Sequence, residues 1–120
     1  MNKERLSKLI QHMETNADDI KPTFNMLYYN TCCIFQLPKA FPEDWEYIDV
    51  DFHGNIRAVP KGMTVATYCP FEIMDKALEY LGIDTDGDFL AKNHNFEEQI
   101  DYMKRALLVQ RVKDGLDSWA

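Results

Sequence analysis

The chain has 120 residues, of which 46% are hydrophobic and 28% charged, and its net charge is −7. This length and composition predict one globular domain spanning 1–120, and they exclude an intrinsically disordered chain. No stretch approaches the roughly 20 apolar residues of a membrane span, and the charged N-terminus lacks the apolar core of a signal peptide. We therefore expect a cytoplasmic protein without a membrane partner.

The negative charge is concentrated in the middle of the chain. Residues 43–101 carry 14 acidic and 4 basic side chains, whereas the flanking segments are slightly basic. Nucleic-acid binding relies on Lys and Arg to replace phosphate counterions, so the acidic centre argues against direct binding of DNA or RNA. It favours solubility and attraction to a basic partner.

Residues 3–14 are predicted to form an amphipathic helix. Apolar side chains recur there at helical spacing, at Leu6, Leu9, Ile10 and Met13. Asn2 can cap the start of this helix, and Asn16 is expected to end it in a left-handed turn.

Residues 23–37 carry conflicting signals. Pro22 favours a short helix at about 22–29, because proline suits the first helical position. The aromatic and β-branched side chains favour a strand instead, which we place near 31–37. Whether residues 23–30 are helix or strand stays open.

Residues 46–68 are predicted to form a three-stranded antiparallel meander. The hydrophobic alternation predicts two strands joined near Gly54, and Pro60-Lys61-Gly62 is expected to form a second turn. The sequence at 63–68 would then return as the third strand.

The alternation also predicts a register for the first two strands. A three-residue loop at 52–54 places Ile48 beside Ala58 on the buried face and Asp49 beside Arg57 on the exposed face. A two-residue loop would place core residues beside charged ones.

Two further helices follow. Residues 70–81 begin with Pro70 and end before Gly82, and their predicted apolar stripe is Phe71, Met74, Leu78 and Leu81. The last helix is predicted at about 96–113, and its predicted stripe is Phe96, Ile100, Met103 and Leu107. Asn95 and Glu98 form a pattern like a capping box before it, and Gly115 follows its expected end.

Together these elements predict an α+β fold. It consists of a small antiparallel sheet, the three-stranded meander near 46–68, with three or four helices packed on one face. A fourth strand near 31–37 is an option.

Asp49, Asp51 and His53 are spaced two apart and can be interpreted as metal ligands or as the exposed side of a hairpin. A metal site needs three or four converging ligands and a supporting outer shell, whereas Gly54 indicates that the chain turns here. We favour the hairpin.

Asp84, Asp86 and Asp88 resemble part of a calcium loop. The calcium pattern requires carboxylates at its first and twelfth positions, where this chain has Gly82 and Asn93. We therefore interpret the segment as a turn, and we expect no metal and no cofactor.

The three cysteines form no disulfide framework, since the count is odd and Cys32 and Cys33 are adjacent. Cys69 precedes a predicted helix, which can lower a thiol pKa, but no pattern assigns it a histidine partner. We interpret all three as structural.

Three hypotheses for function follow. The first is an acidic protein-binding module that inhibits or regulates a partner with a basic surface, in a narrower version as a nucleic-acid mimic acting on a DNA- or RNA-handling defence enzyme. Its predicted binding residues are Glu43, Asp44, Asp49, Asp51, Asp84, Asp86 and Asp88. The second is an enzyme based on Cys69 or on Asp49 and Asp51, and the third is a homo-oligomeric structural subunit, which an exposed apolar patch would support.

Overall fold

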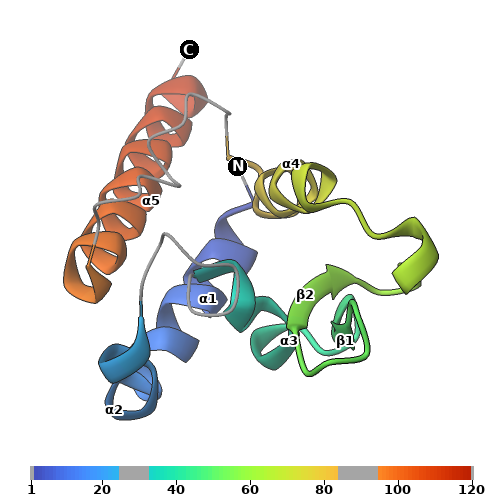
Figure 1. Ribbon diagram of the computed structural model, residues 1–120. Coiled ribbons are helices and arrows are strands. Elements are labelled where there is room, and N and C mark those ends of the chain that lie inside the picture. Colours follow the sequence, from blue (N-terminus) through green and yellow to red (C-terminus); the bar gives the residue numbers. More distant parts are fainter. Residues whose placement is uncertain (1, 25–32, 84–94, 120) are drawn as a thin grey trace.

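The computed structural model describes residues 2–24, 33–83 and 95–119, and the described part is dominated by helices (Figure 1). The helices are α1 (Lys3–Thr15), α2 (Ala17–Ile20), α3 (Leu37–Ala40), α4 (Pro70–Leu81) and α5 (Phe96–Trp119). Three 3₁₀ turns are η1 (Lys21–Thr23), η2 (Cys33–Gln36) and η3 (Val65–Thr67). The strands β1 (Trp45–Asp49) and β2 (Ile56–Pro60) form one antiparallel hairpin.

Helix α1 lies at the centre of the molecule and contacts α2, α3, α4 and α5 (Figure 1). Its stripe of Leu6, Leu9, Ile10 and Met13 is at most 5% exposed, as the spacing predicts. The Asn2 side chain accepts a hydrogen bond from the Arg5 backbone N–H at 3.0 Å, which confirms the predicted cap. Asn16 does end the helix, but with φ −107° and therefore not in a left-handed turn.

The predicted meander is wrong, because the described chain contains only a two-stranded sheet. Residues 63–68 do not return as a strand, and the turn η3 forms within them. Thr64 and Thr67 explain the difference: the Thr67 hydroxyl accepts from the Thr64 N–H at 2.8 Å, while the two hydroxyls lie 3.2 Å apart. These side chains satisfy backbone groups that a strand would have paired with a neighbour.

The strand predicted near 31–37 is also wrong over its described part. Residues 33–40 form η2 and then α3, with Pro38 in the first turn of α3. Cys33, Ile34, Leu37, Ala40 and Phe41 are all at most 5% exposed. Their spacing follows a helix and not a strand, so helical turns bury them on one side. The helix predicted at about 22–29 falls mostly on residues outside the described ones, and its first residues belong to η1.

The hairpin forms where the sequence predicts it, but in a register shifted by one residue. Ile48 pairs with Arg57 and Asp49 with Ile56, so the predicted Asp49–Arg57 pair does not form. The connection contains four residues, 51–54, because Val50 N–H bonds the Asn55 carbonyl at 3.1 Å. A one-residue shift turns side chains to the opposite face, and Ile56 is accordingly 37% exposed.

The two long C-terminal helices begin as predicted. Helix α4 ends at Gly82, which has φ +68°, a left-handed conformation that suits glycine. Its buried side chains include the predicted Leu78 and Leu81 together with Ile73 and Ala77, and the predicted Met74 packs half-buried against the same core. Helix α5 begins with the predicted capping box, in which Glu98 N–H donates to Asn95 Oδ1 at 2.8 Å and Asn95 N–H to Glu98 Oε1 at 3.3 Å.

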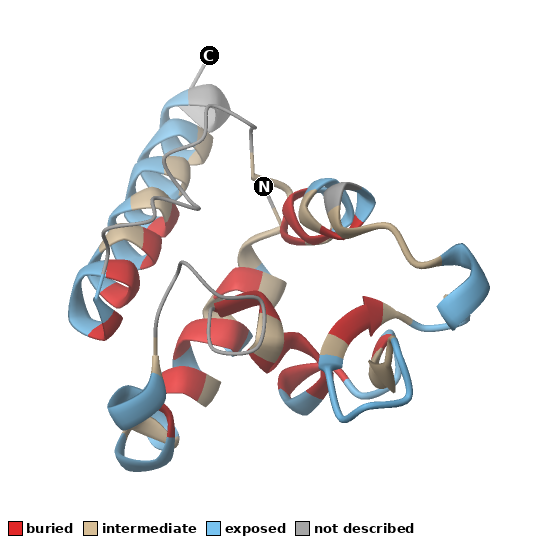
Figure 2. Ribbon diagram, viewed as in Figure 1, coloured by how far each residue is buried: buried red, intermediate tan, exposed pale blue. Residues whose placement is uncertain are grey.

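Helix α5 continues through Gly115 to Trp119, beyond its predicted end. Helix α1 is its main packing partner, so α5 stands at one side of the molecule (Figure 1). Among the residues of α5 whose burial is described, 96–116, the buried ones all lie in the first half, the last being Leu107 (Figure 2). The described core therefore surrounds α1 and leaves the second half of α5 at the surface.

Candidate protein-binding surface

The four described acidic residues predicted to bind a partner lie at the two ends of β1. Glu43 and Asp44 precede the strand and are exposed, Asp49 is its half-buried last residue, and Asp51 is exposed in the loop. A strand of this length separates its ends by roughly 17 Å. Asp84, Asp86 and Asp88 lie outside the described residues.

Asp49 and Asp51 hold the hairpin loop in place. Asp49 Oδ2 accepts from Gly54 N–H at 2.9 Å, and Asp51 Oδ1 accepts from His53 N–H at 2.9 Å. The His53 N–H, followed by the Asn55 side chain, lowers the pKa of Asp51 below its usual value. These contacts support a structural role for the pair, in agreement with the hairpin interpretation.

Asp44 is held by the end of α4. Tyr80 donates its hydroxyl proton to Asp44 Oδ2 at 2.6 Å, and Arg5 stacks on the Tyr80 ring at 3.8 Å from its centroid. Burial, followed by the bond to Asp44, raises the pKa of Tyr80. The tyrosine therefore stays protonated and acts as a hydrogen-bond donor to Asp44.

Asp49 and Asp51 lie together at the hairpin loop, whereas Cys69 lies on a different element, at the start of α4. Cys69 is half-buried at the start of α4, and within the described residues no hydrogen bond joins it to a histidine. Cys33 is 1% exposed and lies 3.8 Å from the buried Gln99 amide nitrogen. No group of three or more His, Cys, Asp or Glu side chains in the described part of the chain could hold a metal ion.

The most unusual surface is the outward face of α5, defined by Leu108, Val109, Val112 and Leu116. These side chains are 60%, 52%, 56% and 67% exposed. Successive helical residues are about 100° apart, so this spacing places all four on one side of the helix, opposite the buried stripe that ends at Leu107. The remaining exposed large hydrophobic residues of the described chain, Phe52, Ile56 and Val65, lie on the hairpin or in η3.

The sequence prediction missed this face although its residues are visible in the sequence. A helix whose apolar side chains point to two opposite sides has no single periodic stripe, and the assignment of Phe96 through Leu107 to the core used only one side. Gly115 appeared to end the helix before Leu116, which hid the second stripe.

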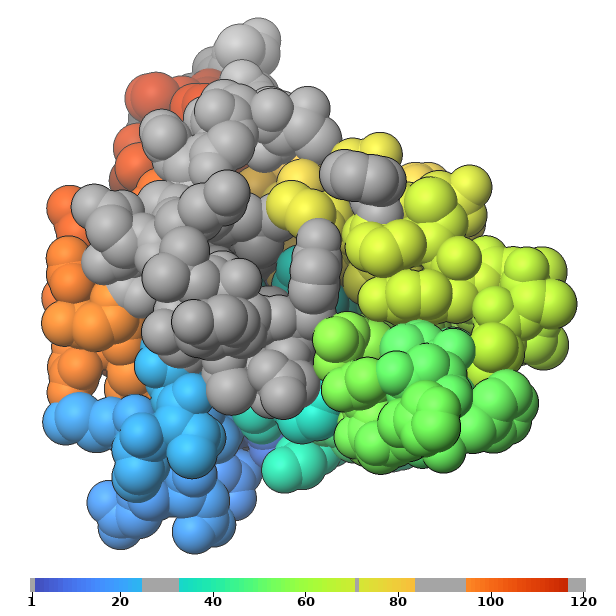
Figure 3. All heavy atoms as spheres, in the orientation of Figure 1, coloured from blue at the N-terminus to red at the C-terminus, as the bar shows by residue number. Residues whose placement is uncertain are grey.

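The outward face of α5 is bordered by cations. Arg105 lies one turn before Leu108, and Arg111 and Lys113 lie on the two sides of Val112. Figure 3 shows α5 at one edge of the molecule and the green atoms of the acidic hairpin at the opposite edge. The basic-bordered apolar face and the acidic hairpin are therefore separate surfaces.

Comparisons with known proteins do not assign either surface. No protein-family model matches the chain, and neither a curated protein nor a solved structure is detectably similar to it. Among the described helices, none combines the length and apolar content needed to cross a lipid bilayer.

Proposed function

We propose that this chain is a small protein-binding module and that the outward face of α5 is its main contact surface. The observation that carries the proposal is the row of four large apolar side chains, each more than half exposed, on one side of one helix. Single exposed apolar residues are common, whereas contiguous ones mark interaction sites. An amphipathic helix that inserts into a partner's groove is a recurrent mode of recognition.

Such a module would regulate or inhibit its partner by occupying a surface. The face lies on the C-terminal half of α5, where the opposite side of the helix is tied to the body by an ion pair between Lys3 and Asp114. The helix is thus held before binding, which lowers the entropy cost of association. The enzyme alternative, based on Cys69 or on Asp49 and Asp51, stays an untested prediction.

Affinity purification from the native host tests this proposal when wild type is compared with the triple variant Leu108→Ala, Val112→Ala, Leu116→Ala. The control is Val65→Ala, which truncates an apolar residue that is 38% exposed outside α5. We expect a partner that wild type and control retain and the triple variant loses. The purified partner should likewise bind wild type and the control but not the triple variant. If each partner binds the triple variant as well as wild type, the proposal fails.

The acidic surface is a second candidate. Glu43, Asp44 and Asp51 are exposed, which supports contact with a basic protein, and the nucleic-acid-mimic version remains a narrower form of this proposal. Glu43→Lys tests it best, because Asp44 and Asp51 also bind Tyr80 and the loop. Loss of a partner with Glu43→Lys, together with weaker binding at high salt, would support it. If every partner binds Glu43→Lys as well as wild type and binds equally well at high salt, the acidic surface is not a contact surface.

A further inference from the structure

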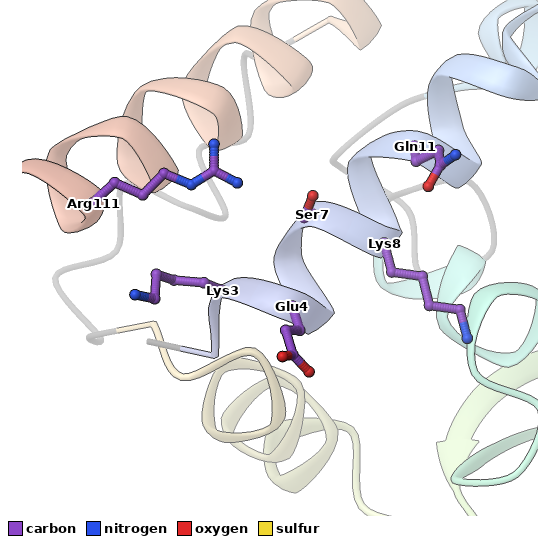
Figure 4. A pocket seen from close by; sticks show the side chains of 6 residues that line it. All are labelled: Lys3, Glu4, Ser7, Lys8, Gln11 and Arg111. Carbon is purple, nitrogen blue, oxygen red and sulfur yellow. The ribbon is translucent and has the colours of Figure 1, made fainter. Parts of the chain in front are cut away.

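A groove between α1 and the second half of α5 borders the outward face of α5. Its volume is about 440 Å³, and it is lined by Lys3, Glu4, Ser7, Lys8, Gln11 and Arg111. Figure 4 shows Arg111 extending from α5 toward α1, with the Ser7 hydroxyl pointing into the gap and Lys3 at its edge. Lys8 and Glu4 point to the other side of α1.

The groove is basic although the chain is acidic. Three cationic side chains and one carboxylate line it, in a protein of net charge −7. Lys3 is paired with Asp114, and this contact lowers the pKa of Asp114. Lys8 lies 5.1 Å from the centre of the Phe41 ring, on the side of α1 that faces away from the gap. The positive charge that faces the gap therefore comes from Arg111, beside the Lys3–Asp114 pair.

Arg111 belongs to both the groove and the border of the apolar face. It lines the groove, and it lies about 60° around the helix from Leu108. A ligand seated on Leu108 and Val112 would thus extend over Arg111 on one side and Lys113 on the other. The apolar residues and the cations form one continuous surface.

We infer that the partner presents an apolar face bordered by carboxylates, most simply an acidic amphipathic helix. This inference rests on the proposed function and specifies its partner. Aliphatic side chains of the partner would pack on Leu108 and Val112, while its carboxylates would meet Arg111 and Lys113. Carboxylates that reach the groove would also find the Ser7 hydroxyl as a donor.

Two other occupants fit less well. A second copy in a two-fold contact would bring this face against itself, and therefore Arg111 and Lys113 against their own counterparts. An anionic lipid surface would attract the same cations but would be repelled by the net charge of −7. The face also has two valines among its four apolar residues, whereas interfacial helices favour Trp, Phe and Leu.

Selection of a random peptide library displayed on phage, with the purified chain as bait, tests the inference. We expect enriched peptides with helically spaced apolar residues and net negative charge. Their affinity should be lost in the triple variant Leu108→Ala, Val112→Ala, Leu116→Ala. It should fall about threefold in Arg111→Gln, as for one exposed ion pair. Lys39→Gln removes an equal charge from α3 and should change nothing.

The outcomes separate the two proposals. Enriched peptides that need the apolar face but are neutral or basic would overturn the inference and leave the proposed function standing. Peptides that bind the triple variant as tightly as wild type, or no enrichment of peptides at all, would overturn both the inference and the proposed function. A dimer in sedimentation that the triple variant abolishes would assign the face to a second copy and overturn the inference. Binding to phosphatidylglycerol vesicles, abolished by the same variant, would overturn both.

Discussion

At the scale of single residues, the hairpin loop shows how side chains replace missing backbone partners. Its four residues include Phe52 at φ +62° and Gly54 at φ +85°, both in the left-handed region. For a residue other than glycine this conformation costs roughly 1 kcal/mol or more. Asp49 and Asp51 offset this cost by accepting the loop's N–H groups.

Asp49→Ala should therefore destabilise the fold. The variant loses the acceptor for Gly54 N–H, and we expect a loss of about 0.5–1.5 kcal/mol in the free energy of unfolding. Urea denaturation followed by circular dichroism measures it. Glu43→Ala, an exposed carboxylate before β1, is the control and should stay within about 0.5 kcal/mol of wild type. Equal effects of the two substitutions would contradict the assigned role of Asp49.

The buried hydroxyl of Tyr47 should make the folded chain less stable at alkaline pH. Its hydroxyl donates to the Phe35 carbonyl at 2.6 Å, and burial raises its pKa to about 12. In the unfolded chain a tyrosine titrates near 10. Its contribution is thus fully present below about pH 10 and is lost as pH rises toward 12, because the unfolded state releases the proton first.

Urea denaturation between pH 8 and pH 11, in roughly half-unit steps, measures this loss, with Tyr47→Phe as the comparison. The phenylalanine variant lacks the hydroxyl, so the gap in stability between it and wild type should narrow as the pH rises. A gap that is constant over this range would show that the folded hydroxyl titrates like an ordinary tyrosine.

At the scale of elements, the sequence predicted the helices that have a single apolar stripe and a clear cap. Helices α1 and α4 and the start of α5 follow from apolar spacing together with Asn2, Gly82 and the Asn95–Glu98 box. In each of them local and tertiary preferences agree, which makes an element predictable.

The predictions were wrong where side-chain hydrogen bonds set the conformation of the backbone. Thr64 and Thr67 close a turn where β-propensity favours a strand, and Asp49 with Asp51 lengthens the hairpin loop and shifts its register. β-Propensity mostly measures fit to a sheet surface, and in the described chain the hairpin has no third strand to provide one. The candidate site on α5 was missed for a related reason, because periodicity alone does not distinguish a second apolar face from core.

Gly115 offers a direct test of the length of α5. It lies inside the helix without a positive φ, and a Cβ added there would meet no atom within 4 Å. Gly115→Ala should therefore stabilise the fold by about 0.5–1 kcal/mol, because glycine costs that much within a helix. Thermal unfolding measures the gain. Gly62→Ala is the contrasting variant. Gly62 has φ +96°, a conformation that strains alanine, so this substitution should destabilise the fold. A destabilised Gly115→Ala would mean that the helix ends earlier.

At the scale of the whole molecule, the domain is built around one central helix. Helix α1 packs against four other helices, and α5 reaches the described core through the side that ends at Leu107. The molecule therefore carries a long helix with two apolar sides, one used for folding and one left for solvent (Figure 2). A surface that folding does not need is available to be selected for binding.

Two adjacent leucines separate these roles. Leu107 is 6% exposed and Leu108 is 60% exposed, although both occupy the same helix. Leu107→Ala should cost about 2–5 kcal/mol in the free energy of unfolding, because it leaves a cavity in the core. Leu108→Ala should change it by less than about 0.5 kcal/mol, as an exposed position that alanine suits. Chemical denaturation of both variants in the same buffer provides the measurement.

If Leu108→Ala destabilised the fold as much as Leu107→Ala, the outward face would be part of the core and could not serve a partner. A stable Leu108→Ala that loses its partner would instead assign that side of α5 to binding alone.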